Sequence, residues 1–419
     1  MLIIYFFLNN FFLNLLNIIK VKKKNIYYFM SLISSKYVED EYIENVKKYK
    51  YKGGDNSIYY YYAISPISNF MVNYFPKTLA PNTVTISGWF LNFFNLILTI
   101  YYGGWKGCDY YPPWVCYLTS FTYSLYIYLD AADGKQARRL NASSPLGLLF
   151  DHGTDACTTF YVPIVSGAML FYNNIYQYLL IYFPIMTTFF FNTWEEYYVG
   201  ELVLPVINGV EEGSLYVSAI HLLSGLYGTS LFFKQYNIFG FSLKFNEING
   251  YITFIGGCLF TFASFIGVLF KIPRKKIFNA LKDTLIYFIF IVSLLSVIIL
   301  NDSIIVKDYP KLLILTYGFE FAKILGILQV SHISNSPFKS LKPVFLIPLL
   351  SILIHSLIFY FTRKSFIINI DTIICGAFVW NFLSWLHFVY FCSDEICEIL
   401  NINRFKLGPR YPPSKKKQK

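Results

Sequence analysis

The sequence predicts an all-α, polytopic integral membrane protein with about ten transmembrane helices. The chain has 419 residues, of which 55% are hydrophobic and only 14% are charged, a composition that fits a soluble globular domain poorly. A helix that crosses the bilayer needs about 20 predominantly apolar residues. Ten such stretches follow one another, beginning near residues 83, 114, 152, 176, 215, 251, 282, 311, 342 and 371.

Basic residues between these stretches predict the orientation of the chain. Ten spans put both flanks on one side of the membrane, and lysines gather in both flanks, at residues 47–52 and 415–417. Since Lys and Arg concentrate in cytosolic loops, both termini are expected in the cytosol, together with the loop that holds Arg138 and Arg139. This distribution accounts for the net charge of +11, so we expect no nucleic-acid partner.

Segments outside the spans complete the domain organisation. Residues 36–82 mix apolar and charged side chains and are expected to form a cytosolic amphipathic segment along the membrane surface. Residues 83–395 form the transmembrane domain. Residues 396–419 form a cytosolic basic tail, whose last four residues resemble a dilysine retrieval signal of the endoplasmic reticulum, although a plain basic tail is equally compatible.

The first 35 residues stay unassigned. Residues 2–19 are apolar but contain asparagines, and four lysines lie between residues 20 and 24. This stretch could be an eleventh span, a signal-anchor, or sequence upstream of a true start at Met30.

Four aspartates, Asp130, Asp133, Asp151 and Asp155, lie at the ends of the second and third apolar stretches. They are spaced by three and by four residues, so each pair projects from one face of a helix. If the second span ends near 133 and the third begins near 147, the helices form an antiparallel hairpin and the pairs can face one another. Four convergent carboxylates repel unless cations lie between them, and hard oxygen ligands suit Mg²⁺ or Mn²⁺.

Two other interpretations of this region stay open. The aspartates could face water or pair with the basic residues of the connecting loop, but ionisable groups near the membrane usually mark function. Three small residues, Gly134, Ala137 and Gly147, leave room for a ligand beside the acids. Small residues also permit close helix packing, which explains them equally well.

The same residues carry a resemblance to a known family. The pattern D-x2-D-G-x2-A-R-x8-G-x3-D-x3-D, from Asp130 to Asp155, resembles the signature of the CDP-alcohol phosphotransferases at all eight fixed positions. Further segments resemble the eukaryotic choline and ethanolamine phosphotransferase branch, and together they cover about residues 46–408. They are "LAPNTVTISG" at 79–88, "SSPLG…LFDHG" at 143–153, "TWEEYYVG" at 193–200, expected as a loop after the fourth span, and the weaker "QVSHISN" and "EICEILNINRF".

This resemblance implies roles for the acids. Asp130, Asp133 and Asp151 match metal ligands that hold two Mg²⁺ or Mn²⁺ ions, and Asp155 matches a fourth ligand that is also a candidate base. His152 matches the histidine expected to take the proton from the acceptor hydroxyl.

It also implies a nucleotide site. Gly134, Ala137 and Gly147 match positions beside the cytidine nucleotide, Arg138 a position near the donor phosphates, and Asn82 a position near the nucleotide.

Two positions depart from the branch. Leu148 stands where a glutamate is usual, and Tyr198 where a histidine is usual. If that glutamate normally orients the histidine, the assignment of His152 as base is weakened and Asp155 gains weight.

The implied activity is transfer of phosphocholine, phosphoethanolamine or both from CDP-choline or CDP-ethanolamine to diacylglycerol, giving phosphatidylcholine or phosphatidylethanolamine and CMP. The implied location is the endoplasmic reticulum membrane, and a homodimer is common in the family. Another CDP-alcohol phosphotransferase, such as a phosphatidylinositol synthase, is the nearer alternative, but those chains are shorter. A transporter is the alternative of a different class, although the acids here lie in one hairpin and not along a pathway through the membrane.

Overall fold

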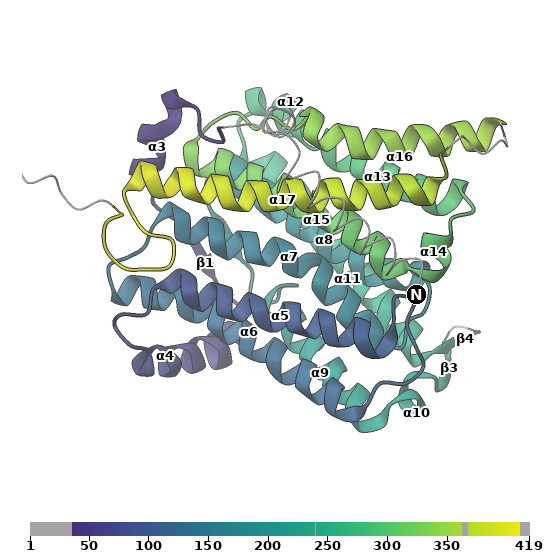
Figure 1. The fold of residues 1–419 in the computed structure, drawn as a ribbon. Coiled ribbons are helices and arrows are strands. Elements are labelled where there is room, and N and C mark those ends of the chain that lie inside the picture. The colour runs from purple at the N-terminus through teal and green to yellow at the C-terminus, as the bar shows by residue number, and fades with distance from the viewer. Residues whose placement is uncertain (1–35, 239, 363–367, 411–419) are drawn as a thin grey trace, which may run out of the picture. The chain divides into compact units, whose positions relative to one another are not determined.

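The computed structural model describes residues 36–238, 240–362 and 368–410. A single compact unit begins at Val38 and is built almost entirely from helices (Figure 1). The N-terminal apolar run at 2–19 and the end of the basic tail, from residue 411, lie outside the described residues.

Within the described residues this unit contains ten long helices, and each of the ten predicted stretches begins within a few residues of one of them or inside it. They are α5 (Pro81–Gly103), α6 (Pro113–Arg139), α7 (Pro145–Met169), α8 (Ile175–Val199), α9 (Glu211–Tyr227), α11 (Phe245–Lys271), α13 (Leu285–Leu300), α15 (Pro310–Ser334), α16 (Pro343–Thr362) and α17 (Ile370–Leu400).

Within the described part of the chain, six helices are long and apolar enough to cross a membrane: α5, α11, α15, α16, α17, and α13 taken together with α12 (Arg274–Asp283). The helices α6 to α9 fall outside this group, and α9 has only 17 residues. An all-α membrane architecture is therefore confirmed, whereas ten spans stay a prediction.

Short elements join the long helices. Before α5 lie η1 (Asp40–Tyr42), α3 (Ile43–Lys48), β1 (Gly53–Asp55), η2 (Tyr60–Ile64) and α4 (Ser65–Tyr74). Later come β2 (Leu202–Leu204), α10 (Thr229–Phe232), β3 (Gln235–Ile238), β4 (Phe241–Lys244) and α14 (Ile304–Asp308). Strands β1 and β2 pair in parallel, with Gly53 opposite Leu202, and β3 pairs with β4 in antiparallel orientation.

Proline and capping residues define the ends of the helices that carry the acids. Helices α6 and α7 begin at Pro113 and Pro145, where the missing N–H costs no hydrogen bond and the fixed φ favours a first turn. The Ser144 hydroxyl caps α7 by accepting from the Gly147 amide at 3.2 Å. Helix α8 ends at Val199 and is capped by Gly200, whose φ of +90° lies in the left-handed region that glycine adopts without strain.

Helix α15 forms the centre of the bundle, and its entire membrane-crossing window is buried. It packs against α7, α8 and α17. A Cβ on Gly318 or on Gly326 would lie 2.3 Å from a ring atom of Phe160 or Phe388, so these glycines allow the helices to approach closely. Side chains near the C-terminal end of α15 consequently meet those of α7 and α8.

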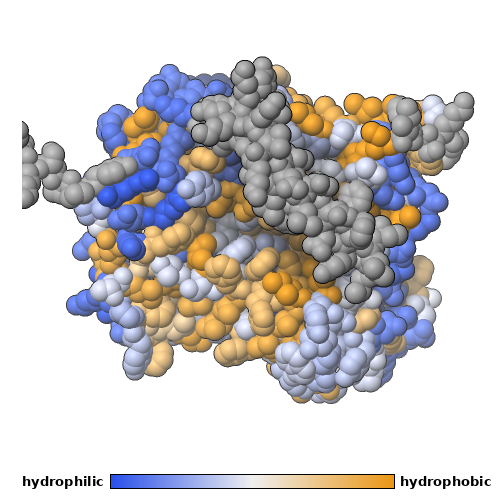
Figure 2. Space-filling model, viewed as in Figure 1, coloured by the Kyte–Doolittle hydropathy of each residue, from blue (hydrophilic) through white to orange (hydrophobic). Residues whose placement is uncertain are grey.

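Apolar side chains cross the middle of the face seen in Figure 2, and hydrophilic side chains gather towards the two ends of the helices. This distribution is the one expected of a helical bundle in a bilayer.

Candidate active site at the ends of α6, α7 and α8

The four predicted acids lie at the junction of α6 and α7. Helix α6 extends to Arg139, six residues beyond the predicted end near 133, and α7 begins at Pro145, two residues before the predicted start near 147. The aspartates therefore lie within regular helix, where the three- and four-residue spacings place each pair on one helical face.

Three of the four acids converge. Asp130, Asp151 and Asp155 each offer a carboxylate oxygen, and these oxygens all lie within 4.8 Å of one another. Oδ1 of Asp130 is buried and accepts no hydrogen bond from any described residue. A divalent cation fits this arrangement, since it would supply the missing partner and offset the repulsion between the carboxylates. The donor set of three hard oxygens is compatible with Mg²⁺ or Mn²⁺.

Two nearby basic side chains, Lys135 and Arg139, are engaged elsewhere. The Lys135 ammonium donates to the carbonyl and hydroxyl oxygens of Ser65, at 2.7 and 2.8 Å. The Arg139 guanidinium donates to the Phe75 carbonyl oxygen at 3.1 Å. Both contacts tie α6 to the region of α4, so these residues do not neutralise the three acids.

Asp133 occupies a different environment. It is only 7% exposed, and its Oδ2 accepts a hydrogen bond from the Thr85 hydroxyl on α5. Asp133 is not among the three acids whose oxygens converge, so its role as a metal ligand stays a prediction.

Asp155 is held by a second contact. The Tyr126 hydroxyl donates to Asp155 Oδ1 at 2.5 Å and accepts from the Thr158 hydroxyl at 3.3 Å. Because Tyr126 is 2% exposed, its ring has little freedom and keeps this carboxylate oriented.

His152 meets a carboxylate that the sequence analysis did not predict. Its Nδ1 lies 3.4 Å from Oε2 of Glu196, whose side chain is 1% exposed. The Gln329 amide donates to the same Glu196 oxygen at 2.8 Å and also contacts His152 Nδ1. A buried carboxylate beside an imidazole orients the ring and stabilises its protonated form.

These contacts correct two expectations. The partner of His152 is Glu196, so the leucine at position 148, which is buried, does not leave the histidine unsupported. The segment "TWEEYYVG" is not a loop, because Thr193 to Val199 form the last turns of α8. The pair Glu195 and Glu196 at the end of the fourth apolar stretch was the sequence signal for this role.

Tyrosines before β1 and a second histidine complete this polar cluster. His332 Nε2 lies 3.8 Å from Glu196 Oε1 and 2.9 Å from the Tyr49 hydroxyl. Burial, with smaller contributions from the Glu196 and Asp151 carboxylates, raises the pKa of Tyr51 to about 12. A tyrosine hydroxyl is protonated at neutral pH even without this shift, so it can donate a hydrogen bond.

The residues expected beside the nucleotide lie in two groups. In the first, Asn82 donates to the Arg404 carbonyl oxygen at 2.8 Å, and a Cβ on Gly147 would lie 3.7 Å from Asn82 Oδ1. In the second, a Cβ on Gly134 would lie 3.4 Å from an Arg138 guanidinium nitrogen. Ala137 is half-buried in the last turn of α6 and Arg138 is exposed there. Both groups lie at the acid end of the bundle.

Tyr198 lies apart from His152. Its hydroxyl donates to Asp283 Oδ2 at 2.5 Å, which ties the end of α8 to α12. The tyrosine at this position therefore has a structural contact of its own.

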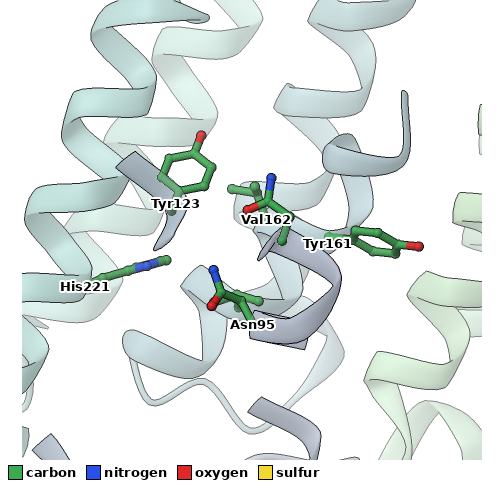
Figure 3. Close-up of a pocket in the computed structure, with 7 residues that line it drawn as sticks. Asn95, Tyr123, Tyr161, Val162 and His221 are labelled. Carbon is green, nitrogen blue, oxygen red and sulfur yellow. The ribbon is translucent and has the colours of Figure 1, made fainter. Parts of the chain in front are cut away.

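A small polar pocket lies deeper in the bundle, where Asn95, Tyr123 and His221 surround a narrow space (Figure 3). His221 Nε2 contacts the Ser166 hydroxyl at 3.0 Å, while Nδ1 of His221 and Nδ2 of Asn92 have no hydrogen-bond partner among the described residues. The volume that the centre of a water molecule can occupy in this pocket is about 10 Å³. This is close to the minimum that one buried water needs. No predicted site residue lines this pocket.

Comparison with known proteins agrees with this geometry. Residues 78–211 match the family model described as CDP-alcohol phosphatidyltransferase. A Saccharomyces cerevisiae protein named Choline/ethanolaminephosphotransferase 1 is 29% identical over 342 residues, which cover 77% of this chain and 85% of the yeast protein.

Two further relatives extend the similarity. An Arabidopsis thaliana protein, also named Choline/ethanolaminephosphotransferase 1, is 28% identical over 88% of this chain and 98% of its own length. A Schizosaccharomyces pombe protein described as an uncharacterized CDP-alcohol phosphatidyltransferase class-I family protein is 30% identical over 71% of this chain and 79% of its own length.

A helical membrane bundle with convergent carboxylates and a histidine–glutamate pair at one end is compatible with the membrane phosphotransferase that these comparisons indicate. The chain belongs to the CDP-alcohol phosphatidyltransferase family.

Proposed function

We propose that this protein transfers phosphocholine, phosphoethanolamine or both from the CDP-alcohol to diacylglycerol, releasing CMP. The observation that carries the proposal is the adjacency of the Asp130, Asp151 and Asp155 oxygens to His152 with its Glu196 partner. The names of the yeast and Arabidopsis relatives favour choline and ethanolamine as the alcohols.

Asp130, Asp151 and Asp155 would hold the divalent cation, and we assign Asp133 as the fourth acid of a two-ion Mg²⁺ or Mn²⁺ site. Bound there, the ions would neutralise the diphosphate of the donor and the charge that develops on the leaving CMP. Tyr126 keeps Asp155 oriented, and the Thr85 hydroxyl does the same for Asp133.

His152 is the proposed base. It takes the proton from the diacylglycerol hydroxyl as that oxygen forms a bond to the phosphorus that bears the alcohol, and the bond from this phosphorus to the CMP phosphate oxygen breaks. Glu196 stabilises the resulting imidazolium from Nδ1, which leaves Nε2 to face the acceptor. Asp155 remains the second candidate base.

Donor binding falls to the nucleotide residues. Arg138, exposed at the end of α6, would pair with the donor phosphates, and Gly134, Ala137 and Gly147 would leave room for the cytidine nucleotide. Asn82 lies beside Gly147 and would complete this surface.

We place the protein in the endoplasmic reticulum membrane with the acid end of the bundle and both termini in the cytosol. The basic flanks support this orientation. In this arrangement residues 36–82 form the cytosolic segment before the transmembrane catalytic domain at 83–395, and residues 396–419 form the tail. The soluble donor arrives from the cytosol and the acceptor from the bilayer.

The experiment is a parallel assay of the full chain reconstituted in vesicles with diacylglycerol and Mn²⁺. CMP release is measured with CDP-choline and, separately, with CDP-ethanolamine, and vesicles without diacylglycerol are the control. We expect acceptor-dependent CMP release with at least one donor. Release only from CDP-diacylglycerol with a soluble alcohol would contradict the proposal and favour an enzyme of the phosphatidylinositol synthase kind.

A further inference from the structure

A groove that no step of the proposed reaction uses lies between α8, α11 and α13. It has a volume of about 270 Å³ and is lined by Thr187, Phe191, Cys258, Thr261, Phe262, Phe265 and Phe288. Phe262 and Phe288, at its edges, are 66% and 52% exposed. Since α11, and α13 taken together with α12, are long and apolar enough to cross a membrane, this groove opens towards hydrocarbon.

Polar contacts close the groove at the acid end of the bundle. Phe265 of α11 stacks on Trp194 of α8, with ring centroids 5.7 Å apart. The next residue of α8, Glu195, accepts hydrogen bonds from Ser264 at 2.8 Å and from Lys271 at 2.6 Å. The groove therefore has an apolar floor and a polar rim, which matches the division between the chains and the head group of a lipid.

Positive charge gathers above this rim. Five basic side chains follow within twelve residues at the end of α11 and along α12, and all five are exposed: Lys271, Arg274, Lys275, Lys276 and Lys282. The single acid of α12, Asp283, accepts a hydrogen bond from Tyr198. Helix α12 also exposes Phe278, at 76%, and Leu281, at 42%. A short helix with exposed basic and apolar side chains is typical of a segment at the boundary between lipid head groups and acyl chains.

We propose that this surface, made of the α8–α11–α13 groove and the basic residues of α12, binds an anionic glycerophospholipid of the leaflet at the acid end. One acyl chain lies in the groove and the phosphate lies against Arg274, Lys275 and Lys276. Basic residues at a membrane boundary attract anionic head groups, and the groove beneath them supplies a place for the chain.

This lipid site is separate from the reaction site. Phe191 and Glu196 are five residues apart on α8, so their side chains project about 140° apart around the helix axis. Helix α12 is nevertheless held to the catalytic end of α8, because the Trp194 indole donates to the Ala280 carbonyl oxygen at 3.1 Å. The proposal does not depend on which head group the enzyme transfers.

Trp194 provides the test, because bromine on an acyl chain quenches a tryptophan only at short range. The full chain is reconstituted in phosphatidylcholine vesicles that contain an equal small fraction of either brominated phosphatidylserine or brominated phosphatidylcholine. The difference between the wild type and Trp194→Phe isolates the Trp194 signal. We expect stronger quenching by the brominated phosphatidylserine.

Matched variants separate the contribution of the basic residues to lipid binding from that of the groove. Lys275→Gln/Lys276→Gln should lower the preference for phosphatidylserine by roughly tenfold, and Lys50→Gln/Lys52→Gln, which removes the same charge elsewhere, should leave it intact. Cys258→Phe fills the groove and should reduce quenching by both lipids. Leu259→Phe, at the neighbouring position that is 65% exposed, should not.

The proposal would be overturned if the two brominated lipids quench equally, or if Lys275→Gln/Lys276→Gln keeps the wild-type preference for phosphatidylserine. The groove would then hold a boundary lipid without head-group preference. If Trp194→Phe fails to fold, mass spectrometry of the lipids that co-purify with the wild type is the alternative measurement. The proposal then requires that phosphatidylserine is retained in preference to phosphatidylcholine. If the protein prefers phosphatidylserine but releases no CMP, the proposed reaction is contradicted and this lipid site is not.

Discussion

The two halves of the candidate active site are built in different ways. The acid site draws on two helices that follow one another, and all of its acids lie between Asp130 and Asp155. The histidine site draws on three helices, with His152 on α7, Glu196 on α8 and Gln329 on α15, and spans 177 residues from His152 to Gln329. The acid site depends on the negative charge of its groups, whereas the histidine site depends on the packing that holds a buried carboxylate against an imidazole.

This difference predicts how each half fails. Removing one charge from the acid site should abolish function while the fold persists, because the carboxylates contribute repulsion and not packing. Changes in the histidine site should lower the rate in steps, since residues that orient the base act indirectly.

The largest effect is expected from Asp151→Asn. The substitution keeps the shape of the side chain and removes one charged ligand, so turnover should fall by roughly 10³-fold or more. CMP release from reconstituted protein measures it. Asp308→Asn, which removes an exposed carboxylate paired with Lys106, is the matched control and should retain activity. Full activity in Asp151→Asn would show that this acid holds no essential cation.

His152→Ala should lower turnover by about 10²- to 10⁴-fold, the usual contribution of a general base. His221→Ala is the control for loss of a buried histidine away from the acids. If His152→Ala keeps a wild-type rate while an Asp155 variant does not, Asp155 is the base.

Glu196→Gln should have an intermediate effect. It keeps the volume but removes the charge beside His152, so kcat should fall by about 10- to 100-fold with little change in the KM for the CDP-alcohol. Steady-state kinetics at varied donor concentration separate the two parameters. Glu195→Gln, at the adjacent position that faces Ser264 and Lys271, should be much milder. Equal losses in the two variants would argue for a structural role of this turn of α8.

The smallest effect belongs to Tyr126→Phe. It removes one hydrogen bond to Asp155 without opening a cavity, and a bond to a charged group of this kind corresponds to roughly a tenfold loss. The dependence of the rate on Mn²⁺ concentration reports it, since a less oriented Asp155 should shift the curve to higher Mn²⁺. Tyr123→Phe, whose ring packs 6.1 Å from that of Tyr126, is the control. An unchanged curve in Tyr126→Phe would mean that this bond does not orient a ligand.

The acid site was accessible from the sequence because helical spacing places residues three and four apart on one face, so the pairs could be predicted without knowledge of the fold. Whether each acid converges depends on how the helices pack, which explains why the sequence did not separate Asp133, bound to Thr85, from the other three. The positions of the long helices were also predictable, because runs of apolar residues are a strong local signal.

Glu196 was not predicted, for a physical reason. Its partner lies 44 residues earlier in the chain, on a different helix, and Gln329 lies far beyond both. Their meeting depends on the mutual packing of α7, α8 and α15, and Gly318 of α15 permits its close approach to Phe160 of α7. Leu148 stands where a glutamate is usual, on the same helix as His152. The carboxylate that contacts His152 in this protein comes instead from a different helix, α8.

Direct Mn²⁺ binding tests the central claim, that Asp130, Asp151 and Asp155 together form a divalent-cation site. The purified full chain is titrated with Mn²⁺ and free Mn²⁺ is followed by electron paramagnetic resonance, so that the readout does not depend on turnover. Wild type should bind Mn²⁺, and Asp130→Asn, Asp151→Asn and Asp155→Asn should each weaken that binding strongly, with Asp308→Asn unchanged. Mn²⁺ binding of wild-type strength in all three variants would contradict the account.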